Sequence, residues 1–247
     1  MKKKRILNIA IYLILFLILI CSGFKLYFWY KDKKNNDETT EQLKNNVKLE
    51  KIKKDNSNNE KYIVDFKKLK SENSDVVAYI KVNNTNIEYP IVKTSNNNFY
   101  LNHSFDKSKN SRGWIFADYK NKFDNTDKNI VIYGHNMRDE SMFGSLKNIL
   151  NEEWYNNAEN KNITFLTEKG NYIYKVFSIY KIESEDYYIK TNFKNDEDYE
   201  KFLNTIKNRS IKNFDINLNI NDKIITLSTC ANNNKYRVVL HAKKVNN

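Results

Sequence analysis

The residue types that could carry covalent chemistry gather near the C-terminus, in the stretch IITLSTCANNNKYRVV at residues 224–239. Cys230 ends a run of β-forming residues and is followed by a polar turn. The other cysteine of the sequence, Cys21, lies in an apolar N-terminal run, so a domain that contains Cys230 alone cannot form an internal disulfide. Cys230 is therefore predicted to be a reactive thiol presented to a cleft, with an intermolecular disulfide or a buried structural cysteine as the alternatives.

A cysteine nucleophile needs an acid–base partner, and the sequence has three histidines. His135 directly follows the β-like run NIVIYG, so it lies where a strand gives way to a loop. His241 lies inside the last β-like run, and His103 lies in the segment YLNHSF. Two strand ends that carry His135 and Cys230 could meet at one rim of a barrel. His135 is therefore the predicted partner, and a surface-loop histidine is the alternative.

Arg237 is the third group with a predicted chemical role. The chain has 42 basic residues but only five arginines, and Arg237 opens the β-like run that follows Cys230. If the two runs form a hairpin, Arg237 and Cys230 lie near each other across the turn. A guanidinium stays charged and offers a planar fork of donors, which could hold a substrate carbonyl or stabilise an oxyanion. A surface salt bridge is the alternative.

Eight short β-like runs must position these residues. They are rich in Val, Ile, Tyr and Phe, and polar segments separate them. Their ranges are 76–82, 86–92, 113–118, 129–134, 162–167, 171–182, 223–230 and 236–245. Helical patterns occur at 62–73, 141–150 and 196–210. This pattern predicts a mainly β fold, one barrel or sandwich with helical insertions, and the last of these helices lies between the sixth and seventh strands.

The N-terminus indicates a membrane anchor. The basic residues MKKKR precede ILNIAIYLILFLILICSGF, 19 residues without a charge, which is long enough to span a bilayer. The basic tip predicts a cytoplasmic N-terminus and an extracellular domain, and Tyr27–Tyr30 resembles an interfacial aromatic anchor. A cleaved signal peptide is the main alternative, but no small-x-small cleavage site follows the apolar run. A lipoprotein cysteine at Cys21 would require a small residue at position 20, where the sequence has Ile20.

The composition limits the other functional classes. A net charge of +12 is carried mainly by lysine, without an Arg-rich stripe or a nucleic-acid-binding motif, so no nucleic-acid partner is expected. Residues 31–59 are polar and offer only a thin apolar stripe, which predicts a juxtamembrane stalk that is at best partly helical. The predicted organisation is an anchor at 1–30, a stalk at 31–60 and a catalytic domain at 61–247.

The motif TLSTC, an arginine on the following strand and an upstream YGHN together resemble the sortase family of Gram-positive cell-surface transpeptidases. The resemblance covers about residues 62–245. An N-terminal helical segment, the runs NIEYPIV and GWIFADYKN, the stretch YGHNMRDESMFGSL and the helix before the seventh strand resemble class B. This family resemblance implies an eight-stranded sortase β-barrel with an N-terminal helical cap.

The resemblance also implies a ping-pong mechanism. Cys230 would attack a threonyl carbonyl in an NPxTx-like or SPxTx-like sorting signal of a secreted protein. His135 would protonate the leaving amine, and Arg237 would bind the carbonyl and the oxyanion. A peptidoglycan precursor amine would then resolve the thioacyl enzyme. No cofactor and no metal are expected, and although ESED at 183–186 could mimic a calcium site, the class B resemblance argues against calcium.

Six further residues are candidates for substrate binding: five match substrate-binding positions of the family, and Thr229, next to Cys230, could orient the nucleophile, with barrel packing as the alternative for each. These residues are Ser228, Thr229, Asn97, Leu101, Tyr188 and Ile189. The short ANNNKY turn departs from some class B members and should shape one edge of the groove. Two alternatives for the whole protein are a pilin-polymerising sortase and a non-enzymatic wall-associated scaffold. A papain-like protease fits badly, since its cysteine precedes its histidine and lies on a helix.

Overall fold

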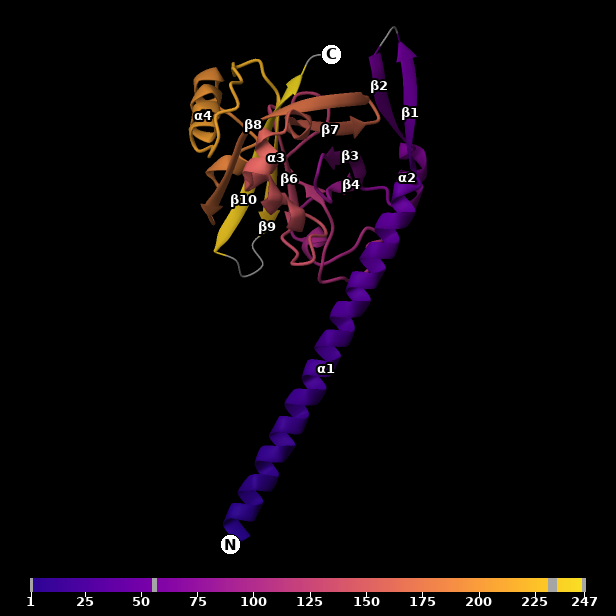
Figure 1. Cartoon of the computed structure of the whole chain (residues 1–247), viewed down its shortest axis with the longest axis vertical. Coiled ribbons are helices and arrows are strands. Elements are labelled where there is room, and N and C mark those ends of the chain that lie inside the picture. Colours follow the sequence, from indigo (N-terminus) through magenta and orange to yellow (C-terminus); the bar gives the residue numbers. More distant parts are fainter. Residues whose placement is uncertain (1, 55–56, 231–234, 246–247) are drawn as a thin grey trace.

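Eight strands close into the β-barrel that the sequence predicts. The computed structural model describes residues 2–54, 57–230 and 235–245, without the side chains of Lys2, residues 49–61 and Cys230. The barrel strands follow one another in the order β10-β8-β7-β3-β4-β5-β6-β9 (Figure 1). Their bounds are β3 (Val76–Val82), β4 (Glu88–Val92), β5 (Phe116–Ala117), β6 (Asn129–His135), β7 (Asn162–Thr167), β8 (Gly170–Glu183), β9 (Ile224–Cys230) and β10 (Tyr236–Val245).

Two of the strand pairs in the barrel are parallel. β4 pairs with β5 through Val92 and Phe116. β6 pairs with β9 along its whole length, from Asn129 opposite Ile224 to His135 opposite Cys230. The antiparallel neighbours include β9 and β10, which form the predicted hairpin. Because β6 and β9 run in the same direction, their C-terminal ends meet at the same rim of the barrel.

Buried aromatic and aliphatic side chains from every barrel strand fill the core. Trp114 is fully buried between β4 and β5, where its indole Nε1 donates to the Pro90 carbonyl at 3.0 Å. Ile80, Phe165 and Leu227 are also buried and belong to the same cluster. The core follows from the high aromatic content, since each large ring removes much apolar surface from water.

Helix α4 (Asp196–Asn208) covers the outside of the barrel beside β8. Its buried residues Tyr199, Phe202, Leu203 and Ile206 are those predicted to share one face, and they pack with Phe177 of β8. Asn195 caps the helix, because its side chain accepts a hydrogen bond from the Asp198 backbone at 2.9 Å. The 3-10 helix η4 (Tyr187–Ile189) lies between β8 and α4.

The helical prediction at 141–150 is only partly correct. The segment forms the 3-10 helix η2 (Gly144–Leu150), followed by α3 (Glu152–Asn156) and η3 (Ala158–Lys161). An α-helix is interrupted there because Met142 has a positive φ of 52° and the Gly144 backbone lies against the Met137 carbonyl. The short 3-10 helix η1 (Phe99–Leu101) and helix α2 (Phe66–Glu72) complete the helices of the domain.

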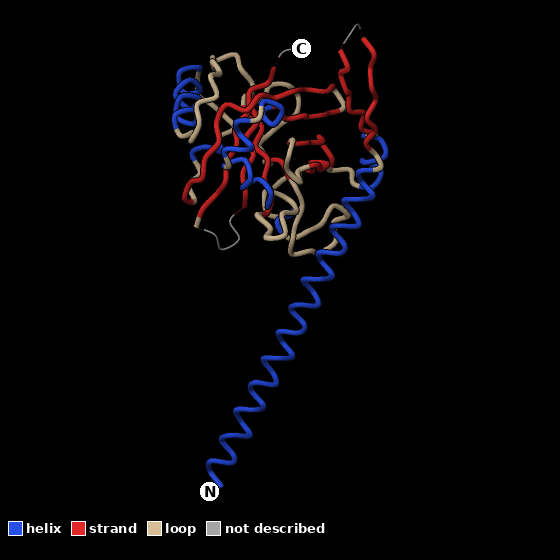
Figure 2. Tube along the Cα trace, viewed as in Figure 1, coloured by secondary structure: helices blue, strands red, loops and turns tan. Residues whose placement is uncertain are grey.

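The N-terminal region differs from the predicted stalk. Helix α1 (Lys2–Lys44) is continuous, and it contains a stretch that is long and apolar enough to cross a membrane. Strands β1 (Val47–Lys54) and β2 (Ser57–Val64) then form an antiparallel hairpin. Figures 1 and 2 show α1 projecting away from the barrel, with its C-terminal part beside the domain. Residues 31–59 are thus only partly helical, as predicted, but the helical part packs on the domain and most of the rest belongs to a hairpin that the sequence did not predict.

The reason for this difference is the composition of the docked helix face. Asp32, Asn36, Thr40 and Leu43 recur at helical spacing, and Asn36 and Leu43 are each 1% exposed. Three of these four residues are polar, so a search for an apolar stripe does not detect the face that packs on the domain.

Candidate active site

The parallel pairing of β6 and β9 brings His135 and Cys230 together. The two residues are direct Cα partners at the end of the ladder, so their backbones are separated by one interstrand distance, about 4.8 Å. Gly134 precedes His135 in β6, and Ile115 and Phe143 pack so closely on it that a Cβ would lie 2.5 and 2.6 Å from them. The strand end is therefore held by tight packing around a residue without a side chain.

His135 is a buried imidazole with one defined hydrogen bond. It is 3% exposed, and its Nε2 donates to the Leu101 carbonyl oxygen at 2.6 Å. Burial lowers the pKa of His135 below its ordinary value, and the hydrogen bond to Leu101 opposes this effect by favouring the charged form. In the part of the chain that the structure describes, no hydrogen-bond partner faces the buried Nδ1 of His135.

Arg237 lies on β10, the other neighbour of β9. The register pairs Val239 with Ser228, and its extension by two residues sets Arg237 opposite Cys230. The guanidinium is half-buried and donates from Nη2 to the Ser184 hydroxyl at 3.2 Å. Among the described residues, its buried Nη1 has no hydrogen-bond partner. One donor of the fork is thus positioned while another remains available to a bound group.

A groove of about 790 Å³ connects these residues. His135, Arg237 and all six predicted substrate-binding residues line it, together with residues that the sequence analysis did not select. Those additional residues are Asn98, Asn102, Phe116, Tyr133, Ser184, Glu185 and Asp186. The volume is in the range of pockets that hold a small ligand or a short peptide segment.

Hydrogen bonds fix most of the predicted groove residues. The hydroxyl groups of Ser228 and Tyr188 form a hydrogen bond of 2.9 Å, which links β9 to η4. Thr229 accepts a hydrogen bond from the Val238 backbone at 3.0 Å, so its hydroxyl also holds β9 to β10. Asn97 donates to the Asp118 carboxylate at 2.8 Å. Ile189 and Leu101 contribute apolar groove surface.

Strand alternation could have found some, but not all, of the groove residues that the sequence analysis did not select. Phe116 and Tyr133 are Cα partners in β5 and β6, and Tyr133 is two residues before His135, so strand alternation could have assigned it to the same face. Tyr133 donates to the Asp118 carboxylate at 2.8 Å. Ser184 follows β8 in a loop, and no periodicity marks it.

The other two histidines occupy different environments. His241 is fully buried, with Nδ1 2.8 Å from the Thr226 hydroxyl and Nε2 2.8 Å from the Tyr180 hydroxyl. Burial lowers its pKa to about 3. His103 stacks on Phe99 at a ring-centroid distance of 4.0 Å. Of the three histidines, only His135 lines the groove. Most of the predicted ANNNKY turn, residues 231–234, lies outside the described residues.

Comparison with known proteins identifies the relatives of this chain. A family model described as a sortase domain matches residues 80–245. The chain is 35% identical to sortase B of Staphylococcus aureus over 230 residues, which covers 93% of this chain and 91% of that protein. A mutant form of Clostridium perfringens sortase B is 42% identical, with a TM-score of 0.68 over 73% of this chain and 86% of that chain. A Staphylococcus aureus sortase B–substrate complex is 37% identical, with a TM-score of 0.69 over 73% of this chain and 84% of that chain.

Proposed function

Because this chain belongs to the sortase family of cysteine transpeptidases, we propose that it cleaves a C-terminal sorting signal of secreted proteins after threonine and joins them to a peptidoglycan amine. The observation that carries the proposal is the pairing of His135 with Cys230 at the end of two adjacent parallel strands, beside the groove that Arg237 lines. A relative, sortase B of Staphylococcus aureus, is known as a substrate complex, which is consistent with a substrate as the occupant of the corresponding groove here.

In the proposed reaction, the Cys230 thiolate attacks the threonyl carbonyl carbon and forms a thioester bond. The His135 imidazolium donates its proton to the leaving nitrogen as the peptide C–N bond breaks. An acceptor amine then attacks the thioester, a new C–N bond forms, and the Cys230 thiolate leaves. The proton that the amine loses returns to His135, which regenerates the starting ion pair.

Arg237 is proposed to stabilise the charge that develops on the carbonyl oxygen. Its Nη2 contact with Ser184 fixes the guanidinium, and Nη1 supplies the donor for the oxyanion. Ser228, Thr229, Asn97, Leu101, Tyr188 and Ile189 are proposed to bind the sorting signal. Since several of their polar atoms are already bonded to neighbours, they would present a rigid wall rather than adapt to the peptide.

We also propose that α1 anchors the enzyme in the membrane. The apolar part of the helix lies at residues 6–24, and its side chains are largely exposed, as expected for a surface that faces lipid. The basic residues at positions 2–5 favour a cytoplasmic N-terminus, which places the barrel outside the cell. Residues 61–247 would then form the extracellular catalytic domain.

The decisive experiment measures peptide cleavage by the full chain in detergent micelles. Fluorogenic peptides with NPxTx, SPxTx and LPxTx motifs are compared for the wild type, Cys230→Ala and the matched control Cys21→Ala. We expect cleavage of at least one motif, a loss of about a thousandfold or more in Cys230→Ala, and unchanged rates in Cys21→Ala. Equal inactivity of all three proteins on every motif would contradict the enzymatic proposal and favour the scaffold alternative.

A further inference from the structure

The polar part of α1 packs against the loop at residues 104–113, which lies beside the proposed catalytic histidine. Asn36 is buried, its side-chain amide donates to the Gly113 carbonyl at 3.1 Å, and its amide oxygen accepts from Ser104 at 2.7 Å and Asn110 at 2.9 Å. One side chain of the helix therefore makes three hydrogen bonds to residues 104–113. Since every one of these bonds is sequestered from water, the loss of a partner leaves a buried polar group unsatisfied.

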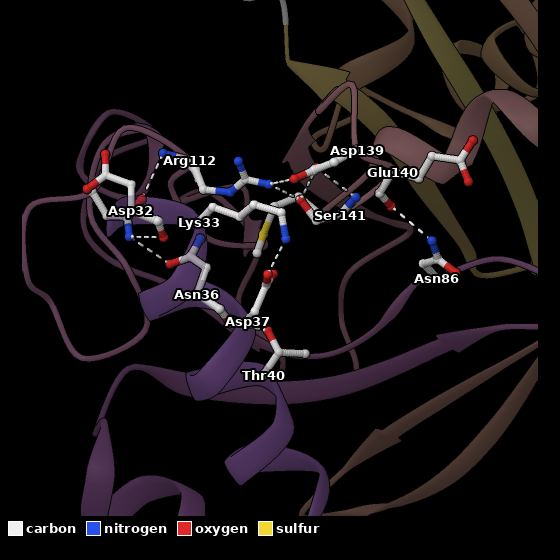
Figure 3. A network of polar contacts seen from close by, with 12 residues as sticks. Asp32, Lys33, Asn36, Asp37, Thr40, Asn86, Arg112, Asp139, Glu140 and Ser141 are labelled. Atoms are coloured by element: carbon white, nitrogen blue, oxygen red, sulfur yellow. Dashed lines mark hydrogen bonds and ion pairs between the residues drawn. The ribbon is translucent and has the colours of Figure 1, made fainter. Parts of the chain in front are cut away.

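Asp32 fastens the same loop one helical turn earlier. Its carboxylate accepts hydrogen bonds from the Ser111 backbone at 2.9 Å and from the Ser111 hydroxyl at 2.6 Å. Figure 3 shows Asp32 and Asn36 on α1 beside the loop that carries Arg112. Arg112 itself pairs with Asp139 and Ser141, which belong to the segment that follows His135.

Gly113 connects the loop that Asn36 and Asp32 hold to the imidazole of His135. Its φ of +59° belongs to the left-handed region, and a Cβ at this position would lie 2.3 Å from the Tyr100 carbonyl oxygen. The same Cβ would lie 2.9 Å from both His135 Cδ2 and the Leu101 carbonyl oxygen. The Gly113 backbone, which Asn36 holds, therefore lies against the His135 ring and against the Leu101 carbonyl group, which accepts the hydrogen bond from His135 Nε2.

We propose that Asn36 is a positioning residue for His135, and that docking of the juxtamembrane part of α1 fixes the ring and the tautomer of this histidine. Asn36 acts through Gly113 and Leu101 and does not touch substrate. The inference rests on the proposed function, because it assumes that His135 is the acid–base group of the reaction. It makes the helix next to the anchor a part of the catalytic apparatus rather than a passive tether.

Asn160 provides a matched control for a purely structural role. It is 2% exposed, its amide donates to the Trp154 carbonyl at 3.1 Å, and its oxygen accepts from Asn84 at 2.7 Å. It is thus a buried, hydrogen-bonded asparagine like Asn36, but its partners are Trp154 and Asn84 rather than residues 104–113. Truncation of either asparagine should destabilise the fold, whereas only truncation at position 36 should disturb His135.

The experiment uses the full chain in detergent micelles with ¹⁵N-labelled histidine. The His135 resonances are assigned by comparison with His135→Gln, and their ¹⁵N shifts report which ring nitrogen carries the proton. In the wild type we expect the Nε2–H tautomer. In Asn36→Ala we expect a mixture of tautomers and a kcat/KM reduced about ten- to a hundredfold, with a lowering of Tm similar to that of Asn160→Ala. Asn160→Ala should keep the wild-type tautomer and kcat/KM.

Asn36→Asp separates the contacts of the side chain. It keeps the oxygen that accepts from Ser104 and Asn110 but loses the donor to the Gly113 carbonyl, so it should show the same mixed tautomers even if Asn36→Ala does not fold. A wild-type tautomer and wild-type kcat/KM in Asn36→Asp would overturn the inference. Failure of the proposed function is recognised separately, as an inactive wild type, and in that case the tautomer measurement still tests the positioning role.

Discussion

Burial of His135 favours its neutral form more than the Leu101 hydrogen bond favours the charged form, and this sets the expected pH dependence of the enzyme. At the ordinary pKa values of about 6.5 for histidine and about 8.5 for cysteine, about one hundredth of the molecules would carry imidazolium with thiolate. Burial lowers the pKa of His135, which makes the reactive ion pair scarcer still unless the pKa of Cys230 is also lowered. Turnover should therefore be modest.

We predict a bell-shaped profile of kcat/KM against pH whose acid limb reports His135. Since the pKa of the free enzyme is lowered, activity should rise with pH through a midpoint below 6.5 and fall again as the cysteine is deprotonated at higher pH. The measurement is kcat/KM for a fluorogenic sorting peptide between pH 5 and 10. A flat profile over this range, or an acid limb at pH 7 or above, would contradict the role of His135.

Arg237 should not be replaceable by lysine. Its Nη2 is held by Ser184 and its Nη1 is the proposed oxyanion donor, an arrangement that needs two nitrogens in a planar fork. We predict that Arg237→Lys lowers kcat by about a hundredfold or more with a smaller change in KM, because the lost interaction forms mainly in the transition state. Arg209→Lys, at the C-terminal end of α4, is the matched control. A loss confined to KM would instead assign Arg237 to ground-state binding.

At the scale of elements, His241 joins three strands of the barrel through a buried polar network. It lies on β10 and contacts Thr226 of β9 and Tyr180 of β8. Burial lowers its pKa to about 3, so between that value and about 6.5 the unfolded chain binds a proton that the folded chain does not. The contribution to stability is thus present above about pH 6.5 and is lost as the pH falls.

We predict that His241→Gln makes the fold less sensitive to acid. In the wild type, this histidine alone should lower the free energy of unfolding by about 1.4 kcal/mol for each pH unit below about 6.5. The test compares denaturant unfolding of wild type and His241→Gln at pH 8 and pH 5. The difference at pH 8 measures the lost contacts, and it should shrink or reverse at pH 5. An equal difference at both values would show that His241 does not titrate on unfolding.

The strand elements could be predicted from the sequence where a β-rich run is bounded by polar residues. The predicted ranges of β7 and β10 match the structure, whereas β5 contains only Phe116 and Ala117 of the six residues predicted. The run around β5 is cut short because Gly113 turns with a positive φ before it and the Asn121 backbone bonds to the Asp118 carbonyl after it. Such limits depend on contacts with distant segments, which the local pattern does not contain.

The candidate site was predictable at its centre but not at its supports. His135 and Cys230 each end a β-like run, so their meeting follows once the two strands are neighbours. The role of the Leu101 carbonyl and of Asn36 could not be predicted, because a backbone acceptor has no sequence signature and the docked face of α1 is polar.

At the scale of the whole molecule, α1 sets the distance between the barrel and the proposed membrane. The helix is continuous from its apolar part to Asp32, the first residue that bonds to the domain loop. From Phe24 to Asp32 it rises roughly 12 Å, at about 1.5 Å per residue. Trp29 lies within this short connection, and the Arg112 guanidinium lies 5.9 Å from its ring. The barrel would therefore stay next to the surface of the proposed membrane.

Two truncations should separate the anchor from the docked helix. Removal of residues 1–30 deletes mostly exposed side chains and the contact between Trp29 and Arg112, so the remaining chain should be soluble and cleave peptides within about twofold of the full chain. Removal of residues 1–46 also deletes Asn36 and the buried Leu43, which exposes to water the apolar surface and the polar groups of the domain that they cover. We expect a Tm lower by roughly 5–10 °C and a reduced kcat/KM. Equal Tm and equal activity of the two truncated chains would show that the docked helix contributes nothing to the catalytic domain, and the anchor would then be a simple tether.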